Sequence, residues 1–320
     1  MNTNQDINKA LVAPMLSVAQ NLSYQKPITN GLHKILSRAT MLAQVNKEKL
    51  IQFGKKCTLK TTGKLDGSHP ITFVIYHVPF DTSADKAIGS FDVPTIDHAK
   101  IKHLELVRWT IQEIKNVVPE AEIVVCTDIP FAEKIQDLEP SILIPEVEKN
   151  RPMYYRAKTY NTIVQQEQIK GTIVFLDSDA IVLKNPINLP SQLNFKVGVT
   201  ARFAPNLMPV NEGVIIADAG SQECIDFFAH YMGTYQAIKD DSIIKGITKN
   251  DLMRWRGGQL SLNAVCPGSK MLDFRDSSRA LKILSCDLYN YTVRDKSEIV
   301  DLKREDKVYV AHIKGKAKMS

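Results

Sequence analysis

Short apolar runs alternate with helical apolar stripes from residue 71 onward. Runs rich in β-branched and aromatic residues predict strands over residues 71–78, 121–126, 142–144, 173–176, 196–200 and 213–217. Apolar positions at helical spacing predict helices over residues 95–117, 154–168 and 222–232, and Asp97 is the expected cap of the first. Strands that alternate with helices favour an α/β protein with a mostly parallel sheet and helices on both faces.

Two aspartates, Asp177 and Asp179, follow the apolar run 173–176 directly. Residues two apart in extended backbone point to the same side, so both carboxylates can converge on one site. Ligands of open α/β sheets gather at the carboxyl ends of strands. Two carboxylates held together repel unless a cation or a proton lies between them. The pattern therefore indicates a site for a divalent metal such as Mg²⁺ or Mn²⁺, shared with phosphate groups.

The first seventy residues carry most of the charge asymmetry. They hold ten Lys or Arg and three Asp or Glu, a net charge of +7, whereas the rest of the chain holds 31 and 32 and is nearly neutral. Apolar residues at helical spacing, with His33, Lys34 and Arg38 between them, predict a helix over residues 32–43. This helix either packs on the remainder of the chain with a solvated basic face, which we favour, or contacts an anionic membrane surface or an acidic partner.

Length and composition narrow the class of protein. With 320 residues, 44% hydrophobic and 24% charged, the chain fits a soluble protein with one enlarged α/β domain. We expect a basic helical N-terminal segment at residues 1–69, a main domain at 70–320 and no nucleic-acid partner. No apolar run approaches membrane-spanning length, and the first twenty residues lack a secretion pattern. Five scattered cysteines favour reduced thiols, so we expect a cytoplasmic protein.

Several segments together resemble the nucleotide-sugar glycosyltransferases of the GT-A fold, in particular the glycogenin-like family eight and its relatives. The segments are RAKTY (Arg156 to Tyr160), FLDSDAIVLKNP (Phe175 to Pro186), NEGVI (Asn211 to Ile215) and HIKGKAK (His312 to Lys318). The second is similar to the family's DxD strand, the third to its NxGV segment and the fourth to its HxxGxxK pattern. The resemblance covers roughly residues 70–318. It implies a GT-A type, Rossmann-like domain that moves a hexose, from UDP-hexose by expectation, to a glycan, protein or small-molecule acceptor.

The resemblance also implies a set of metal ligands, Asp177, Asp179 and His312. Mn²⁺ suits this mixed oxygen and nitrogen set better than Mg²⁺, which remains possible. The metal would neutralise the departing diphosphate. The competing interpretation of His312 is a buried core histidine, since it follows the apolar residues 308–310.

Further residues are implied to contact the donor. The expected substrate-binding residues are Tyr76, His77, Arg156, Lys158, Ser178, Asn211, Gly213, Gly258, Gln259, Gly315 and Lys318. Asn211 and Gln259 are the expected catalytic residues, while Gly315 would admit a phosphate and Lys318 would offset its charge. The plainer alternatives are a simple turn at residues 211–213, an exposed helix face at Arg156 and Lys158, and a solvated basic tail.

The chain departs from the family in three places. Gly258 stands where many relatives have an acidic residue before the glutamine. The task of positioning the acceptor or stabilising the developing cation therefore falls to Gln259 or to another residue. The first strand ends in YHVPF (Tyr76 to Phe80), without the usual uridine-binding sequence, although Tyr76 or Phe80 could stack on a base. The Pro-Trp that often follows the final lysine is missing. The resemblance implies retention of anomeric configuration, consistent with the absence of Asp or Glu adjacent to Gln259 in sequence.

Two other classes compete with this interpretation. A catalytically inactive relative that binds nucleotide sugars or serves as a scaffold would fit Gly258 and the basic N-terminal segment. A haloacid-dehalogenase-like phosphatase also begins with an apolar strand and DxD. That fold would leave residues 71–168 without a role, and the only adjacent pair of aspartates further on is Asp240-Asp241 in a polar turn.

Overall fold

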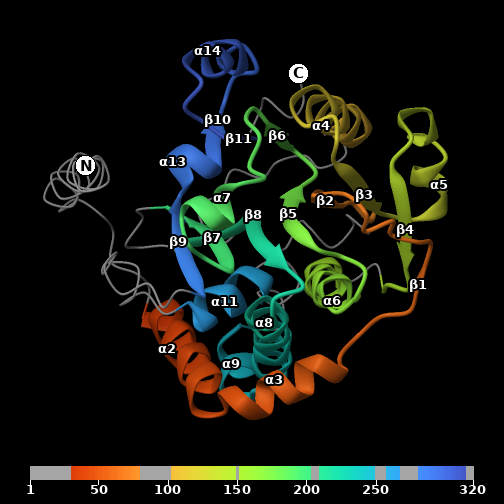
Figure 1. Ribbon diagram of the computed structural model, residues 1–320. Helices are drawn as coiled ribbons and strands as arrows, with labels where there is room; N and C mark the ends of the chain where they lie inside the picture. Colours follow the sequence, from red (N-terminus) through yellow and green to blue (C-terminus); the bar gives the residue numbers. More distant parts are fainter. Residues whose placement is uncertain are drawn as a thin grey trace, which may run out of the picture.

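The computed structural model describes residues 30–79, 102–148, 151–202, 209–248, 257–266 and 280–314 (Figure 1). A central sheet separates two layers of helices, and a smaller sheet adjoins one of these layers. In the described ranges no helix has both the length and the hydropathy that crossing a bilayer requires.

The central sheet has eight strands in the order β1-β4-β3-β2-β5-β8-β7-β9. The strands are β1 (Thr61–Thr62), β2 (Ile71–Tyr76), β3 (Glu122–Cys126), β4 (Ser141–Pro145), β5 (Gly171–Asp177), β7 (Val197–Ala201), β8 (Val210–Ala219) and β9 (Leu281–Ser285). Parallel pairs join β4, β3, β2 and β5 in turn, and another joins β7 to β9. β8 runs antiparallel to β5 and β7, as β1 does to β4. The predicted α/β class with a mostly parallel sheet is confirmed.

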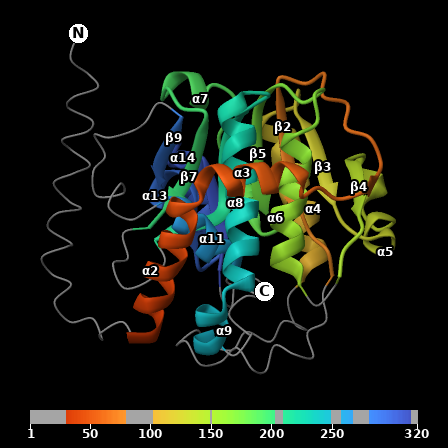
Figure 2. The ribbon, with the colours of Figure 1, turned by 90° about the horizontal axis from the view of Figure 1, so that it is seen from below.

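Helices cover both faces of this sheet because successive strand residues face opposite cores. In β2, Val74 shares a core with α6 (Pro152–Val164), α8 (Gln222–Asp240) and α11 (Gly257–Val265). Its neighbours Phe73 and Ile75 share the opposite core with α4 (His103–Val117) and α5 (Ile129–Ala132). The first group of helices lies in front of the sheet in Figure 2. Shorter helices of the described ranges are η3 (Gln136–Leu138), α7 (Leu189–Gln192), α9 (Ser242–Thr248), α13 (Cys286–Tyr289) and α14 (Glu298–Glu305).

The second sheet brings the end of the described chain to the carboxyl end of β5. Its strands are β10 (Tyr291–Val293), β11 (Val310–Ile313) and β6 (Ala180–Val182), in that order across the sheet. In the antiparallel β11–β6 pair His312 lies opposite Ala180, and the Ile313 N–H donates to the Asp179 carbonyl at 3.0 Å. The register therefore fixes His312 beside the turn that holds the two aspartates.

The basic N-terminal segment contributes α2 (Asn30–Val45), α3 (Lys47–Lys56) and β1. The predicted helix over residues 32–43 is present within α2. Its side chains Ile35, Ala39 and Ala43 are buried in the same core as α8 and α11, and Arg38 pairs with Asp241 at 2.8 Å. The apolar stripe of α2 is thus used for packing within the chain.

The predicted strands agree with β2, β3, β4, β5, β7 and β8, while helix bounds differ more. α4 begins at His103, and residues 80–101, including Asp97, lie outside the described part of the chain. α6 ends at Val164, where polar residues follow, and α8 continues through Gly233, which packs against α3, to Asp240. β9, β10, β11 and α14 were not predicted, since short half-polar segments have no distinctive periodicity.

Candidate functional site

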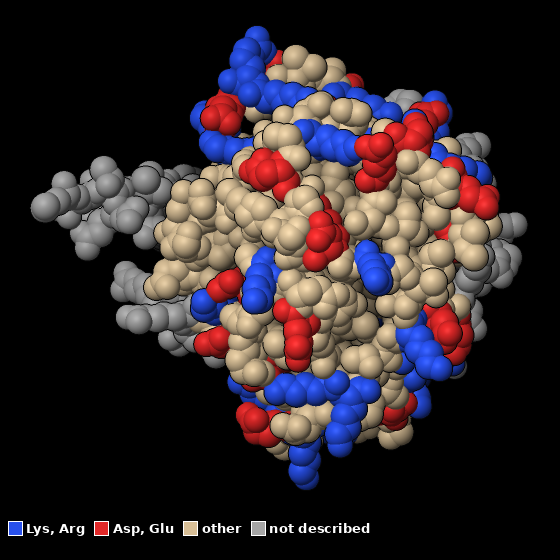
Figure 3. All heavy atoms as spheres, turned by 45° about the vertical axis from the view of Figure 1, so that its right-hand side comes forward, with Lys and Arg blue, Asp and Glu red and all other residues tan. Residues whose placement is uncertain are grey.

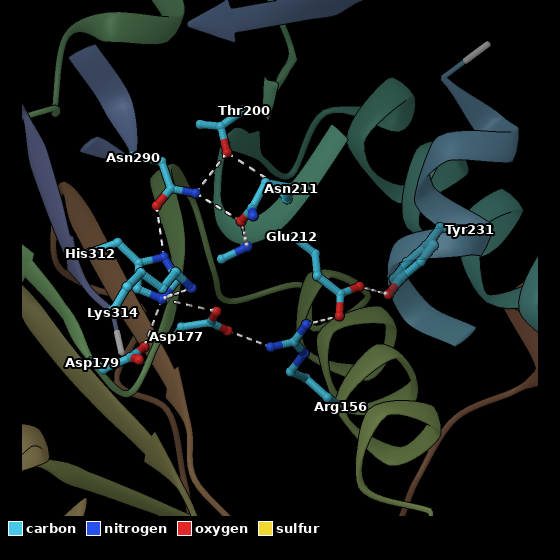
Figure 4. A network of polar contacts seen from close by, with 11 residues as sticks. Arg156, Asp177, Asp179, Thr200, Asn211, Glu212, Tyr231, Asn290, His312 and Lys314 are labelled. Carbon is cyan, nitrogen blue, oxygen red and sulfur yellow. Dashed lines mark hydrogen bonds and ion pairs between the residues drawn. The ribbon is translucent and has the colours of Figure 1, made fainter. Parts of the chain in front are cut away.

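Three side chains converge where β5 turns into β6. Asp177 ends β5, Asp179 lies in the turn and His312 comes from β11. Their ligand atoms all lie within 4.8 Å of one another, and His312 Nε2 is 2.9 Å from Asp179 Oδ1 and 3.6 Å from Asp177 Oδ2 (Figure 4). Among the described residues, this is the cluster of His, Cys, Asp and Glu whose geometry suits a metal ion.

A hydrogen-bond chain fixes which nitrogen of His312 faces the aspartates. The Gly213 N–H donates to Asn211 Oδ1 at 2.8 Å, so this amide oxygen must accept from Asn290 Nδ2 at 2.9 Å. Asn290 therefore presents Oδ1 to His312 Nδ1 at 2.9 Å, and Nδ1 carries the proton. The Nε2 lone pair is left facing the carboxylates, which is the tautomer that a metal ligand needs.

The charges at this cluster also suit a cation. Burial lowers the pKa of His312 below its ordinary value, which keeps the imidazole neutral despite the carboxylate of Asp179. Burial raises the pKa of Asp177, but the Arg156 guanidinium and the other positive groups near it, Lys314 among them, together outweigh burial, and the pKa lies below its ordinary value. An acceptor nitrogen and a carboxylate oxygen 2.9 Å apart require a positive group between or beside them. In this structure the Lys314 ammonium takes that part, with Nζ 2.7 Å from His312 Nε2. The donor set fits a divalent ion, and binding one would displace Lys314.

The segment at residues 212–214 leaves the β7–β8 ladder at a bulge. Val199 pairs with Ile215 and Thr200 pairs with Asn211, so the intervening residues of β8 have no partner on β7. Thr200 Oγ1 bonds the carbonyl oxygens of Asn211 and Val214 at 3.1 and 3.2 Å, which holds the bulge in shape. Bulges of this kind redirect side chains near active sites. Here the bulge turns residues 211–213 toward the metal ligands.

Gly213 approaches those ligands too closely for any larger residue. A Cβ at this position would lie 2.8 Å from Asp177 Oδ2, from His312 Cε1 and from Asn211 Oδ1. The absence of a side chain at position 213 therefore leaves room beside the candidate metal site, which is formed by Asp177, Asp179 and His312.

Arg156 connects the candidate metal site to a buried acidic residue. Its guanidinium, 6% exposed on α6, bonds Asp177 through Nη1 and Glu212 through Nη2 (Figure 4). Tyr231 on α8 donates its hydroxyl to Glu212 Oε2 at 3.0 Å. Sequence reasoning included Arg156 and missed Glu212, Tyr231 and Asn290. Only the position of Glu212 inside the NEGV segment could have drawn attention to it.

Glu212 lies directly beside Gly258, at the start of α11. A Cβ on Gly258 would lie 2.4 and 2.8 Å from the two carboxylate oxygens of Glu212 and 2.9 Å from Tyr231 Oη. Gln259 follows in the same first turn and is partly exposed. The sequence has no Asp or Glu adjacent to Gln259, whereas in space the β8 bulge delivers the Glu212 carboxylate to Gly258, the residue before it.

The other predicted site residues lie at the ends of β2 and β5 and on α6, and Tyr76 is the β2 partner of Asp177. Tyr76 ends β2 with its ring edge-on to Tyr160, and His77 is buried against Phe131, with ring centroids 4.3 Å apart. Ser178 lies between the two aspartates in the turn. Lys158 follows Arg156 by two residues, so it leaves α6 roughly 200° around the helix from it. The predicted roles of Gly315 and Lys318 fall outside the described residues.

No protein-family model matches this chain, and no curated protein matches it by sequence. Solved structures do resemble it. The bifunctional glycosyltransferase WbbM is 13% identical over 79% of this chain and 47% of its own, with a TM-score of 0.44. The glycosyltransferase GlyE of Streptococcus pneumoniae is 13% identical over 77% of this chain and 55% of its own, with a TM-score of 0.44. Galactosyltransferase LgtC, solved with donor and acceptor sugar analogs, is 11% identical over 76% and 87%, with a TM-score of 0.42. The chain thus spans about half the length of the first two of these proteins.

Proposed function

We propose that this protein is a metal-dependent glycosyltransferase. It transfers a hexose from a nucleoside diphosphate sugar, with UDP-hexose as the first candidate, to an acceptor glycan, protein or small molecule, with retention of anomeric configuration. The supporting observation is the cluster of Asp177, Asp179 and neutral His312 at the carboxyl end of β5, with Nε2 directed at the carboxylates. The proposal keeps the cytoplasmic location expected from the cysteines.

Each part of the site has a task in this proposal. Asp177, Asp179 and His312 hold a divalent ion, Mn²⁺ in preference to Mg²⁺, which would neutralise the diphosphate and act as a Lewis acid for its departure. Arg156 adds a buried positive charge beside this site. Asn211 uses Oδ1 within the protein and would offer its Nδ2 donor to a sugar hydroxyl.

The remaining assignments follow the sequence resemblance. Gln259, partly exposed at the start of α11, faces the acceptor side or steadies the developing positive charge on the sugar. Gly315 and Lys318 contact the diphosphate, and Tyr76 or His77 lies toward the base. These roles are proposals that substitution at each position would test.

Thermal unfolding with a panel of nucleotide sugars tests the donor class. A donor at a hundred times its Kd should add about 2.7 kcal/mol to the stability. The shift should require Mn²⁺ or Mg²⁺ and disappear with excess chelator. It should also disappear in D179N, whereas D218N, which alters a carboxylate paired with Lys196 at the opposite end of β8, should keep it. D177N is a less clean variant because it also removes a partner of buried Arg156. Donor cleavage by the chain in excess chelator would refute metal dependence.

One observation favours a second candidate, a nucleotide-sugar-binding protein without turnover. Lys314 contacts the metal-ligand histidine, so an ammonium group can serve as the cation of the site. Metal-independent donor binding with no sugar release or transfer would establish this function instead.

A further inference from the structure

A buried carboxylate of the site has no task in the function proposed above. Glu212 is 6% exposed and lies between Asn211 and Gly213 in the β8 bulge. Its charge is matched by Arg156, which also bonds the metal ligand Asp177. The Glu212 carboxylate is therefore separated from the metal ligands by one guanidinium group. A sugar joined to a metal-bound diphosphate would extend over this short interval.

The carboxylate has capacity for another hydrogen bond. An ionised carboxylate offers about four acceptor positions. Among the described residues, Arg156 uses Oε1 and the Tyr231 hydroxyl uses Oε2. Both partners are buried and hold the group in one orientation, which is how a site prepares an acceptor for a ligand hydroxyl.

The neighbouring helix has been shaped around this carboxylate. Gly258 would place a Cβ 2.4 Å from Glu212 Oε2, closer than real atoms approach. Glu212 and any side chain at position 258 therefore exclude each other. Gln259 is next in the same turn and is the residue proposed to face the acceptor. The Glu212 carboxylate therefore lies between the candidate metal site and the acceptor side.

We propose that Glu212 is the residue that binds the hydroxyl groups of the donor sugar, and that Gly258 is small to make room for it. The inference rests on the proposed function and assigns the sugar specificity of this chain to the β8 bulge. It predicts that Glu212 acts on the sugar half of the donor and not on the nucleotide half.

The test compares the Kd of UDP with that of UDP-hexoses, measured calorimetrically with Mn²⁺, in the wild type and in E212Q. E212Q should weaken binding of the preferred UDP-hexose about tenfold or more and leave UDP within about twofold, because a hydrogen bond to a charged group is lost only with the sugar present. E113Q is the matched control. Glu113 is also buried and bonds Lys303 Nζ at 2.8 and 2.7 Å, but it lies on α4. E113Q should leave the ratio of the two Kd values unchanged.

The outcomes separate the inference from the function on which it rests. If the wild type binds no nucleotide sugar, the proposed function fails and the inference fails with it. If the wild type binds donors and E212Q weakens UDP and UDP-hexose equally, or neither, the inference alone fails and Glu212 serves only to hold Arg156. A double variant, E212A/G258D, supplies a carboxylate from α11 instead. Recovery of the ratio relative to E212A supports the exclusion between the two positions, and a ratio that stays at the E212A value overturns it.

Discussion

At the scale of single residues, the site depends on where small and neutral groups lie. Gly213 and Gly258 leave space beside the metal ligands and beside Glu212, respectively. Asn290 holds His312 in the tautomer that directs Nε2 at the aspartates. None of these three residues is itself charged, yet each determines what the charged groups can do.

Replacing Gly213 by alanine should damage metal binding while leaving the fold in place. The new methyl group would lie 2.8 Å from Asp177 Oδ2 and His312 Cε1, so the ligands must move apart. We expect the Kd for Mn²⁺, measured by calorimetry, to rise about tenfold or more, since displaced ligands lose much of their binding energy. G246A, at a position with open space around it, is the control and should bind Mn²⁺ like the wild type. An unchanged Kd in G213A would contradict the site geometry.

His77 should make the protein sensitive to acid. Burial lowers the pKa of His77 from an ordinary value of 6.5 to about 3, with His103 contributing. Below pH 6.5 the unfolded chain binds a proton that the folded chain refuses, so folding stability falls by about 1.4 kcal/mol per pH unit until the pH nears 3. In H77F this component is absent. Denaturant unfolding of both proteins at pH 7 and pH 5 should show a smaller loss for H77F, and equal losses would show that His77 titrates normally.

At the scale of elements, α3 and α8 pack through two glycines. A Cβ on Gly54 of α3 would lie 1.9 Å from the Ala229 carbonyl oxygen, and one on Gly233 of α8 would lie 2.2 Å from that of Leu50. Asn161 on α6 donates to the carbonyls of Gly54 and Cys57 at 3.0 and 2.9 Å. This close approach, with further contacts from α2 and β1, attaches the basic N-terminal segment to the rest of the chain.

Alanine at Gly233 should destabilise the protein, opposite to its usual effect inside a helix. Glycine to alanine in a helix normally gains about 1 kcal/mol. Here the methyl group would push α3 away from α8, and overpacking of this kind costs about 1–3 kcal/mol. G246A in exposed α9 should show the usual gain. Denaturant midpoints of the two variants should therefore shift in opposite directions. Equal gains would mean that the helices do not pack this closely.

Deletion of residues 1–60 should lower stability by several kcal/mol. It uncovers the apolar surfaces of α8 and α11 that α2 and α3 cover, at about 25 cal/mol per Å². It also removes the carbonyl of Ala43, which lies 2.9 Å from buried His230 Nε2. A truncated chain that melts like the full-length protein, and has lost only salt-sensitive binding to anionic vesicles, would assign the segment to a membrane or acceptor instead.

At the scale of the whole molecule, chemistry is concentrated at one end of the central sheet. The candidate metal site, the β8 bulge and the start of α11 meet there. On the face shown in Figure 3, Asp and Glu lie among Lys and Arg, and the basic side chains are densest along the upper edge. β2, β3 and β4 precede β5 in the same sheet, and Asp241 pairs with Arg38. The phosphatase alternative gives residues 71–168 no role, although three strands of that range belong to the central sheet. It also needs a free acidic pair at the site, whereas Asp241 is engaged by Arg38. Both facts disfavour that alternative.

The proposed reaction should retain anomeric configuration. An inverting transfer needs a base that takes the acceptor proton. Glu212, the carboxylate beside Gly258, is held between a guanidinium and a tyrosine hydroxyl, which makes it a poor base. NMR of the product from an α-linked UDP-hexose should therefore show an α linkage. A β linkage would show that another carboxylate reaches the acceptor.

The sequence alone determined six strands of the central sheet (β2, β3, β4, β5, β7 and β8), the α/β class and the pair of aspartates, because alternation and apolar runs are local properties. Through sequence motifs it also gave four further candidate site residues, which are His312, Arg156, Asn211 and Gly213. Tertiary structure decided how these residues act together. The β11–β6 register brought His312 to the aspartates, and the β8 bulge placed Glu212 against Gly258. Polar contacts between distant segments depend on register and packing, and no periodic pattern along the chain encodes which carboxylate will meet which helix.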